Sequence, residues 1–160
     1  MTVVVLLLTA AFVAFGPAQD RGAKPPFTIR ISADPSMVKV GSGVDVEVVL
    51  KNTSAKPLDC SVAISDLTGQ DPSLTFDVRD ERGNLAPRRV YSYPELATGH
   101  AIVGCAVAPG ETRTEGQDIT RIYDITRPGV YTIQVSKAIS LTNAGAGVVK
   151  SNKMTITVSP

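Results

Sequence analysis

The sequence contains no tryptophan, and aromatic residues of all kinds make up only 5% of its 160 residues. A surface that stacks nucleic-acid bases on aromatic rings is therefore not expected. An excess of charge of one sign is also missing, because 16 basic residues face 15 acidic ones and the formal net charge is +1. Such a balanced surface has no overall field to attract DNA, RNA or anionic lipid. We therefore expect no nucleic-acid partner.

Side chains that carry enzyme chemistry are scarce as well. The only histidine is His100, and a serine or cysteine nucleophile needs a base beside it. The sequence has no Gly-x-Ser-x-Gly elbow, no phosphate-binding glycine loop and no Cys-x-x-Cys or His-x-x-x-His zinc spacing. Asp118 and Asp124 are the only carboxylates whose spacing suggests an acid–base pair, and nothing indicates a cleft around them. We expect a protein that is not an enzyme.

One polar stretch holds four side chains of the kind that bind calcium: Asp77, Asp80, Glu81 and Asn84. Side chains alternate across a strand, which sends Asp77 outward, and Asp80 falls at the turn. We interpret this stretch as a solvated hairpin rather than a calcium site. No metal and no cofactor are expected.

Only one long apolar run is present, Val3–Phe15, and it is short for a bilayer-spanning helix of about 20 residues. A Gly-Pro pair and the small Ala18 follow it, as in a secretory signal peptide cleaved after Ala18. No lysine or arginine precedes the run, so retention as an anchor stays open. We favour removal of residues 1–18, a flexible leader over 19–26 and one domain over 27–160. The protein is then secreted or periplasmic, without stable membrane insertion.

Two cysteines remain in the exported chain, Cys60 and Cys105. An even count in an exported protein predicts a disulfide, and two buried thiols are the alternative. The bridge would close a loop of about 46 residues, and chain entropy alone predicts roughly 4 kcal/mol of stabilisation. The tripeptide Asn52-Thr53-Ser54 fits an N-glycosylation sequon, a pattern that is also common by chance.

Apolar and polar residues alternate in short runs along the rest of the chain, and turn residues separate the runs. This period of two is typical of antiparallel strands that pack on one face. Pro-Gly pairs at 109–110 and 128–129 supply the angles of type II turns. We expect an all-β, antiparallel immunoglobulin-like β-sandwich of about seven strands. The expected strands are Phe27–Ile31, Val44–Lys51, Val62–Ile64, Leu74–Arg79, Thr112–Ile122, Tyr131–Ser136 and Met154–Val158.

Four segments resemble secreted bacterial immunoglobulin-like domains, and their order is similar to that of the bacterial intracellular proteinase inhibitor domain. They are Val44–Asn52 (VDVEVVLKN), Phe76–Asn84 (FDVRDERGN), Ala108–Thr112 (APGET) and Arg127–Val135 (RPGVYTIQV). The resemblance implies an immunoglobulin-like sandwich. That inhibitor family is cytoplasmic, whereas this chain begins with an export-type segment. Tyr131 has two interpretations: its hydroxyl bonds the backbone near Asp124, as in a tyrosine corner, or it lies in water at the edge of the core.

The connection from Leu85 to Val107 is long for a compact domain, and long connections often carry function. Tyrosine and arginine are enriched among the residues that dominate binding energy. The alternative is that Tyr91–Tyr93 forms an edge strand and the rest covers an open end of the sandwich. We expect a non-enzymatic module that binds a protein or cell-surface partner, or alternatively a proteinase inhibitor. The expected partner-binding residues are Arg88, Arg89, Tyr91, Tyr93, Glu95 and His100.

Overall fold

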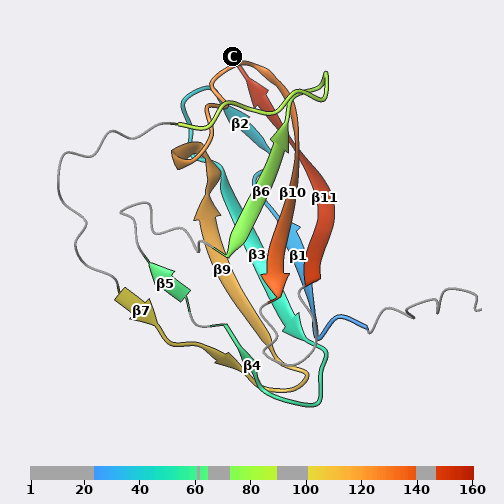
Figure 1. The fold of residues 1–160 in the computed structure, drawn as a ribbon. Helices are drawn as coiled ribbons and strands as arrows, with labels where there is room; N and C mark the ends of the chain where they lie inside the picture. Colours follow the sequence, from blue (N-terminus) through green and yellow to red (C-terminus); the bar gives the residue numbers. More distant parts are fainter. Residues whose placement is uncertain (1–23, 61, 65–72, 90–100, 140–146) are drawn as a thin grey trace, which may run out of the picture.

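The computed structural model describes residues 24–60, 62–64, 73–89, 101–139 and 147–160. Two sheets face each other (Figure 1). The first has the order β1-β3-β9, with β1 at Phe27–Ser32, β3 at Asp45–Asn52 and β9 at Thr112–Asp118. The second has the order β2-β11-β10-β6, with β2 at Met37–Lys39, β11 at Gly147–Ser159, β10 at Gly129–Ile139 and β6 at Leu74–Arg79. The predicted all-β sandwich is confirmed, with seven strands in these two sheets.

Neighbouring strands run antiparallel, except that the short β2 pairs in parallel with the end of β11. Alternation in the sequence becomes alternation of burial, so that β1 and β6 each bury every second residue. Val46, Ile133 and Ile156 come from both sheets and are completely buried between them. Each buried aliphatic side chain of this size contributes about 1.5–3 kcal/mol through the hydrophobic effect.

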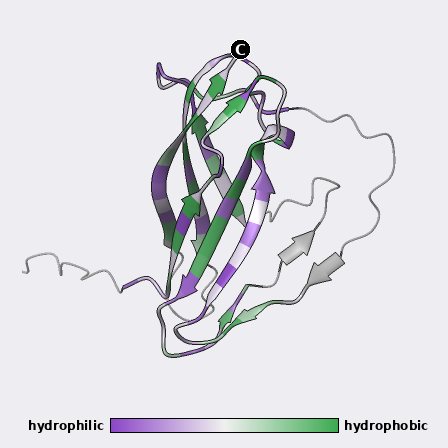
Figure 2. Ribbon diagram, turned by 180° about the vertical axis from the view of Figure 1, so that it is seen from behind, coloured by the Kyte–Doolittle hydropathy of each residue, from purple (hydrophilic) through white to green (hydrophobic). Residues whose placement is uncertain are grey.

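The two edge strands of the first sheet, β1 and β9, differ in what they contact and in their composition. At β1 the side chain of Asn152, on β11, accepts from the Ile31 amide (2.9 Å) and donates to the Ile31 carbonyl (3.1 Å), which joins the two sheets. At the other edge β9 carries no apolar side chain, and it lies beside β3, in which buried apolar residues alternate mainly with charged ones (Figure 2). A polar edge strand resists pairing with other chains.

A two-stranded ribbon leaves the sandwich on the β9 side (Figure 1). β4 at Leu58–Asp59 pairs with β8 at Ala106–Val107, and β5 at Val62–Ile64 pairs with β7 at Ala101–Val103. Between them the Cys60 amide donates to the Cys105 carbonyl (3.0 Å), and the same register continues through all of these pairs. Cys60 and Cys105 form the predicted disulfide, with their Cα atoms 4.9 Å apart.

This ribbon corrects one expectation. Val62–Ile64 is a strand, as predicted, but it pairs with Ala101–Val103 rather than joining either sheet of the sandwich. The disulfide and the continuous register explain the difference, because they align the chain on both sides of Cys60 with the chain on both sides of Cys105.

A second correction concerns the predicted strand Thr112–Ile122. It ends at Asp118, and a 3₁₀ turn, η1, follows at Ile119–Arg121. The Asp118 carboxylate accepts from the Thr120 amide (3.0 Å) and caps this turn. A short acidic side chain that bonds the backbone two residues ahead competes with strand extension.

Tyr131 bonds the backbone as a tyrosine-corner residue does. Its hydroxyl donates to the carbonyl of Arg127 (3.0 Å), four residues upstream, rather than to the backbone nearer Asp124. The side chain is buried, and this burial raises the pKa of Tyr131. The interpretation with a hydroxyl in water is wrong. Among the described residues no helix is long and apolar enough to cross a bilayer.

Candidate functional site

The six predicted partner-binding residues divide into two groups. Arg88 and Arg89 are described and exposed. Tyr91, Tyr93, Glu95 and His100 lie outside the described residues. The segment that carries the two arginines crosses the end of the sandwich where η1, β2 and the C-terminus lie (Figure 1).

Backbone hydrogen bonds hold this segment in place. Beyond the turn after β6, the buried Ala86 donates to the Val78 carbonyl (2.8 Å). The Arg89 amide then donates to the Ile122 carbonyl (2.8 Å), and the Asp124 amide donates to the Pro87 carbonyl (2.8 Å). Residues 86–89 are therefore fixed to β6 at one end and to the chain after η1 at the other.

Arg88 packs on an aromatic ring that is itself anchored. Its guanidinium carbon lies 5.9 Å from the centre of the Tyr123 ring, within the range of a cation–π interaction. The Tyr123 hydroxyl donates to the Phe76 carbonyl, and the side chain is buried. This burial raises the pKa of Tyr123, against a smaller lowering by the Arg88 charge. Tyr123 thus stays neutral and serves as a rigid support for Arg88.

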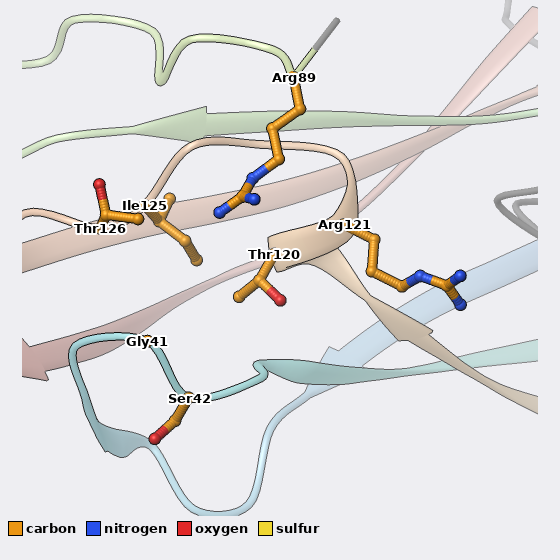
Figure 3. Close-up of a pocket in the computed structure, with 7 residues that line it drawn as sticks. All are labelled: Gly41, Ser42, Arg89, Thr120, Arg121, Ile125 and Thr126. Carbon is orange, nitrogen blue, oxygen red and sulfur yellow. The ribbon is translucent and has the colours of Figure 1, made fainter. Parts of the chain in front are cut away.

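Arg89 lies at a pocket of about 210 Å³ between three segments that are distant in sequence (Figure 3). Its Nε donates to the Tyr123 carbonyl (3.3 Å), and the end of the guanidinium points toward the pocket, whereas Arg121 points away along the rim. The pocket is lined by Gly41, Ser42, Arg89, Thr120, Arg121, Ile125 and Thr126.

Local turns shape the walls of this pocket. After β2 the Ser42 amide donates to the Lys39 carbonyl (3.0 Å), and Gly41 has φ +85°, which only glycine adopts readily. On the opposite wall Thr120 donates its hydroxyl to Asp118, and Ile125 is buried and apolar. The pocket therefore combines a guanidinium, hydroxyl groups and one apolar side.

Asp118 and Asp124, the candidate acid–base pair, each bind their own neighbours. Asp118 Oδ1 accepts from Thr120 and from the Val44 amide (3.4 Å). Asp124 Oδ1 accepts from the Thr126 hydroxyl (2.8 Å). Their positions on two sides of η1, instead of on one face of a strand, follow from the early end of β9.

The polar hairpin after β6 is held together by its own aspartate. Asp80 Oδ1 accepts from the amides of Arg82 (2.9 Å) and Asn84 (2.8 Å), and Oδ2 accepts from the Asn84 side chain (3.1 Å). These hydrogen bonds lower the pKa of the Asp80 carboxyl, and the bond from the Asn84 side chain has the largest effect. Within the described ranges no group of three or more His, Cys, Asp or Glu residues is placed to hold a metal ion.

Asn52 of the sequon is completely buried. Its Nδ2 donates to the carbonyls of Lys56 and Val107, both at 2.8 Å. Its Oδ1 accepts from the amide (2.9 Å) and the hydroxyl (2.8 Å) of Ser54. All four bonds serve the loop between β3 and the ribbon, so this asparagine is a structural residue.

Sequence reasoning missed the pocket, although two local signals mark its walls. Gly41-Ser42-Gly43 has the composition of a turn, and Asp118-Ile119-Thr120 falls within the predicted strand Thr112–Ile122. An Asp two residues before a Thr at the end of a strand is a capping pattern that would have ended β9 correctly.

Comparisons with known proteins give several structural similarities. The sequence matches no family model and no curated protein. The CARDB domain of a Pyrococcus furiosus protein, solved in complex with di-metal ions, is 17% identical at a TM-score of 0.40, and the match covers 82% of this chain and 91% of that domain.

Two larger proteins match over part of their length. A Listeria innocua β-glucosidase in complex with glucose is 16% identical at a TM-score of 0.37, and the match covers 79% of this chain and 16% of the β-glucosidase. The Pseudomonas fluorescens alkylpurine DNA glycosylase AlkC, bound to DNA with an abasic-site analogue, is 14% identical at a TM-score of 0.36. That match covers 79% of this chain and 30% of the glycosylase. This chain thus spans less than a third of either protein. At these values the similarities indicate no shared function, and the fold rests on the strand pairing above.

Proposed function

We propose that the protein is a non-enzymatic, exported β-sandwich module that binds a protein or cell-surface partner through the connection Leu85–Val107. The observation that carries this proposal is that both ends of the connection are fixed. At its start residues 86–89 are bonded to β6 and to the chain after η1. At its end Ala101–Val107 is paired in the ribbon and cross-linked at Cys105.

Fixed ends favour binding for an energetic reason. A connection that is held at both ends loses less conformational entropy when a partner orders it. Arg88 and Arg89 are exposed on the fixed backbone, and arginine and tyrosine side chains are enriched among residues that dominate binding energy. Tyr91, Tyr93, Glu95 and His100 complete the proposed surface.

Export agrees with the cysteine chemistry. Both cysteines of the chain are joined to each other, and such bridges persist in oxidising compartments. This supports the secreted or periplasmic location proposed from the apolar N-terminal run.

We expect the triple variant Arg89→Ala/Tyr91→Ala/Tyr93→Ala to lose the partner that the unaltered protein captures from the envelope of the host. The measurement is a quantitative pull-down, with thermal unfolding of each variant to show that it is folded. Arg30→Ala is the matched control, because it removes the same charge from an exposed position on β1. Capture at equal yield by the triple variant would count against this surface.

The alternative function is inhibition of a protease by the same connection, since a loop with fixed ends also resists cleavage in a protease cleft. If so, the purified protein inhibits at least one member of a panel of serine and metalloproteases at micromolar concentration, and the triple variant inhibits at least tenfold less. Absence of inhibition across the panel would remove this alternative and leave the partner-binding proposal in place.

A further inference from the structure

We propose that the pocket between the β2 turn, the 86–89 segment and η1 binds a small oxyanion, a carboxylate or a phosphate, through the guanidinium of Arg89. This inference stands apart from the partner-binding proposal, because a small anion can occupy the pocket with or without a protein partner.

The first argument is the orientation of Arg89. Its backbone amide donates to the Ile122 carbonyl and its Nε to the Tyr123 carbonyl, so both the backbone and the Nε end of the side chain are held in place. The two terminal amino groups then remain to point toward the pocket (Figure 3). Two parallel donors in one plane match the two oxygens of a carboxylate or of a phosphate edge.

The second argument is the chemistry of the lining. Two arginines and no carboxylate line the pocket. An ion pair joins Arg79 to Asp77, and among the described residues none is found between Arg89 and a carboxylate. Ser42 adds a hydroxyl group to the lining, whereas the Thr120 hydroxyl already donates its proton to Asp118. The buried Ile125 lowers the local polarity on one side, which strengthens a charge-assisted bond.

The third argument is size. The volume of about 210 Å³ exceeds the roughly 30 Å³ of one water several times, so a small oxyanion fits together with bridging waters. Asp118 and Asp124 are near neighbours in sequence of the lining residues Thr120 and Thr126, so their negative charges reduce the net positive charge around the pocket. Each carboxylate accepts hydrogen bonds at Oδ1 from its own turn. Binding therefore depends on the guanidinium geometry, and we expect dissociation constants in the millimolar range.

The test is a titration of the full chain, followed by ¹H–¹⁵N spectra, with acetate in one arm and inorganic phosphate in the other. Ionic strength is held constant with chloride. We expect saturable shifts of the Arg89 side-chain Nε–H and of the Thr120 and Arg121 amides. Saturation with acetate alone, phosphate alone or both supports the pocket and identifies the oxyanion it prefers.

Three variants separate a specific site from general attraction. Arg89→Ala should weaken binding at least tenfold, Arg89→Lys should weaken it less because the charge remains, and Arg30→Ala should bind like the unaltered protein. Thermal unfolding shows whether each variant is folded. If Arg89→Ala is unfolded, the comparison rests on Arg89→Lys. Shifts that grow linearly without saturation, or equal binding by the Arg89 variants, would overturn the proposal.

Discussion

Asn52→Ala should lower the free energy of unfolding by about 3–5 kcal/mol. The alanine removes two bonds donated to the carbonyls of Lys56 and Val107 and two accepted from Ser54. The bond to the Val107 carbonyl is buried, and a buried group left without a partner costs about 1–3 kcal/mol. The measurement is urea unfolding followed by circular dichroism, in which the midpoint should fall while the slope stays constant.

Two variants sharpen this test. Asn52→Asp keeps the shape but replaces the donating amide with a carboxylate that faces two carbonyl oxygens, so it should destabilise at least as strongly as alanine. Thr53→Ala is the matched control at the neighbouring position, because its hydroxyl makes an exposed bond to the Pro25 carbonyl. It should cost less than about 0.5 kcal/mol. A loss below about 1 kcal/mol for Asn52→Ala would show that this network does not stabilise the fold.

The same network bears on the sequon. A glycan on Nδ2 of Asn52 would replace one of its two donated hydrogen bonds and would need space where the side chain has no exposed surface. Folding of the β3–ribbon loop and glycosylation of Asn52 therefore exclude each other. The tripeptide matches the acceptor pattern, but its asparagine serves the turn at the end of β3.

Periodicity predicted the strands of the sandwich because it is a local property. In β1 and β6 the residues that are apolar in sequence are the residues that are buried, and β3 departs from this rule at its end, where Asn52 is buried. Six of the seven strands in the two facing sheets could therefore be expected without knowledge of their pairing. β2 was missed because three residues carry too little alternation to identify a strand, and its parallel pairing with β11 is a long-range contact.

Pairing and the pocket were not accessible in this way. Val62–Ile64 has the pattern of a sandwich strand, and only its alignment with Ala101–Val103 places it in the ribbon. Likewise the pocket combines Ser42, Arg89 and Thr120 from segments that no local pattern connects. The two arginines were singled out by residue type, while the cavity beside Arg89 arises only when η1 and the β2 turn approach it.

Removal of the disulfide should have the other large effect. Cys60→Ala/Cys105→Ala should lower the free energy of unfolding by about 4 kcal/mol, because the cross-link restricts an unfolded loop whose ends are 45 positions apart. That loop contains β6, which pairs with β10 in the core, so the effect should reach the sandwich and not only the ribbon.

The ribbon itself should respond more strongly than the sandwich. An isolated two-stranded ribbon is marginally stable in water, so without the cross-link the pairs Val62–Val103 and Ile64–Ala101, on the side of the disulfide away from the sandwich, should open at little cost. Hydrogen exchange of these amides should then approach the unfolded rate, while the Ile133 amide still exchanges only through global unfolding. The slope of the urea transition should rise, since the unfolded chain becomes more expanded.

Reductant should shift the unaltered protein to the midpoint of the double variant and leave that variant unchanged. If instead the reduced protein unfolds at the oxidised midpoint, the cross-link does not support the fold, and the fixed end at Cys105 on which partner binding depends is lost as an argument.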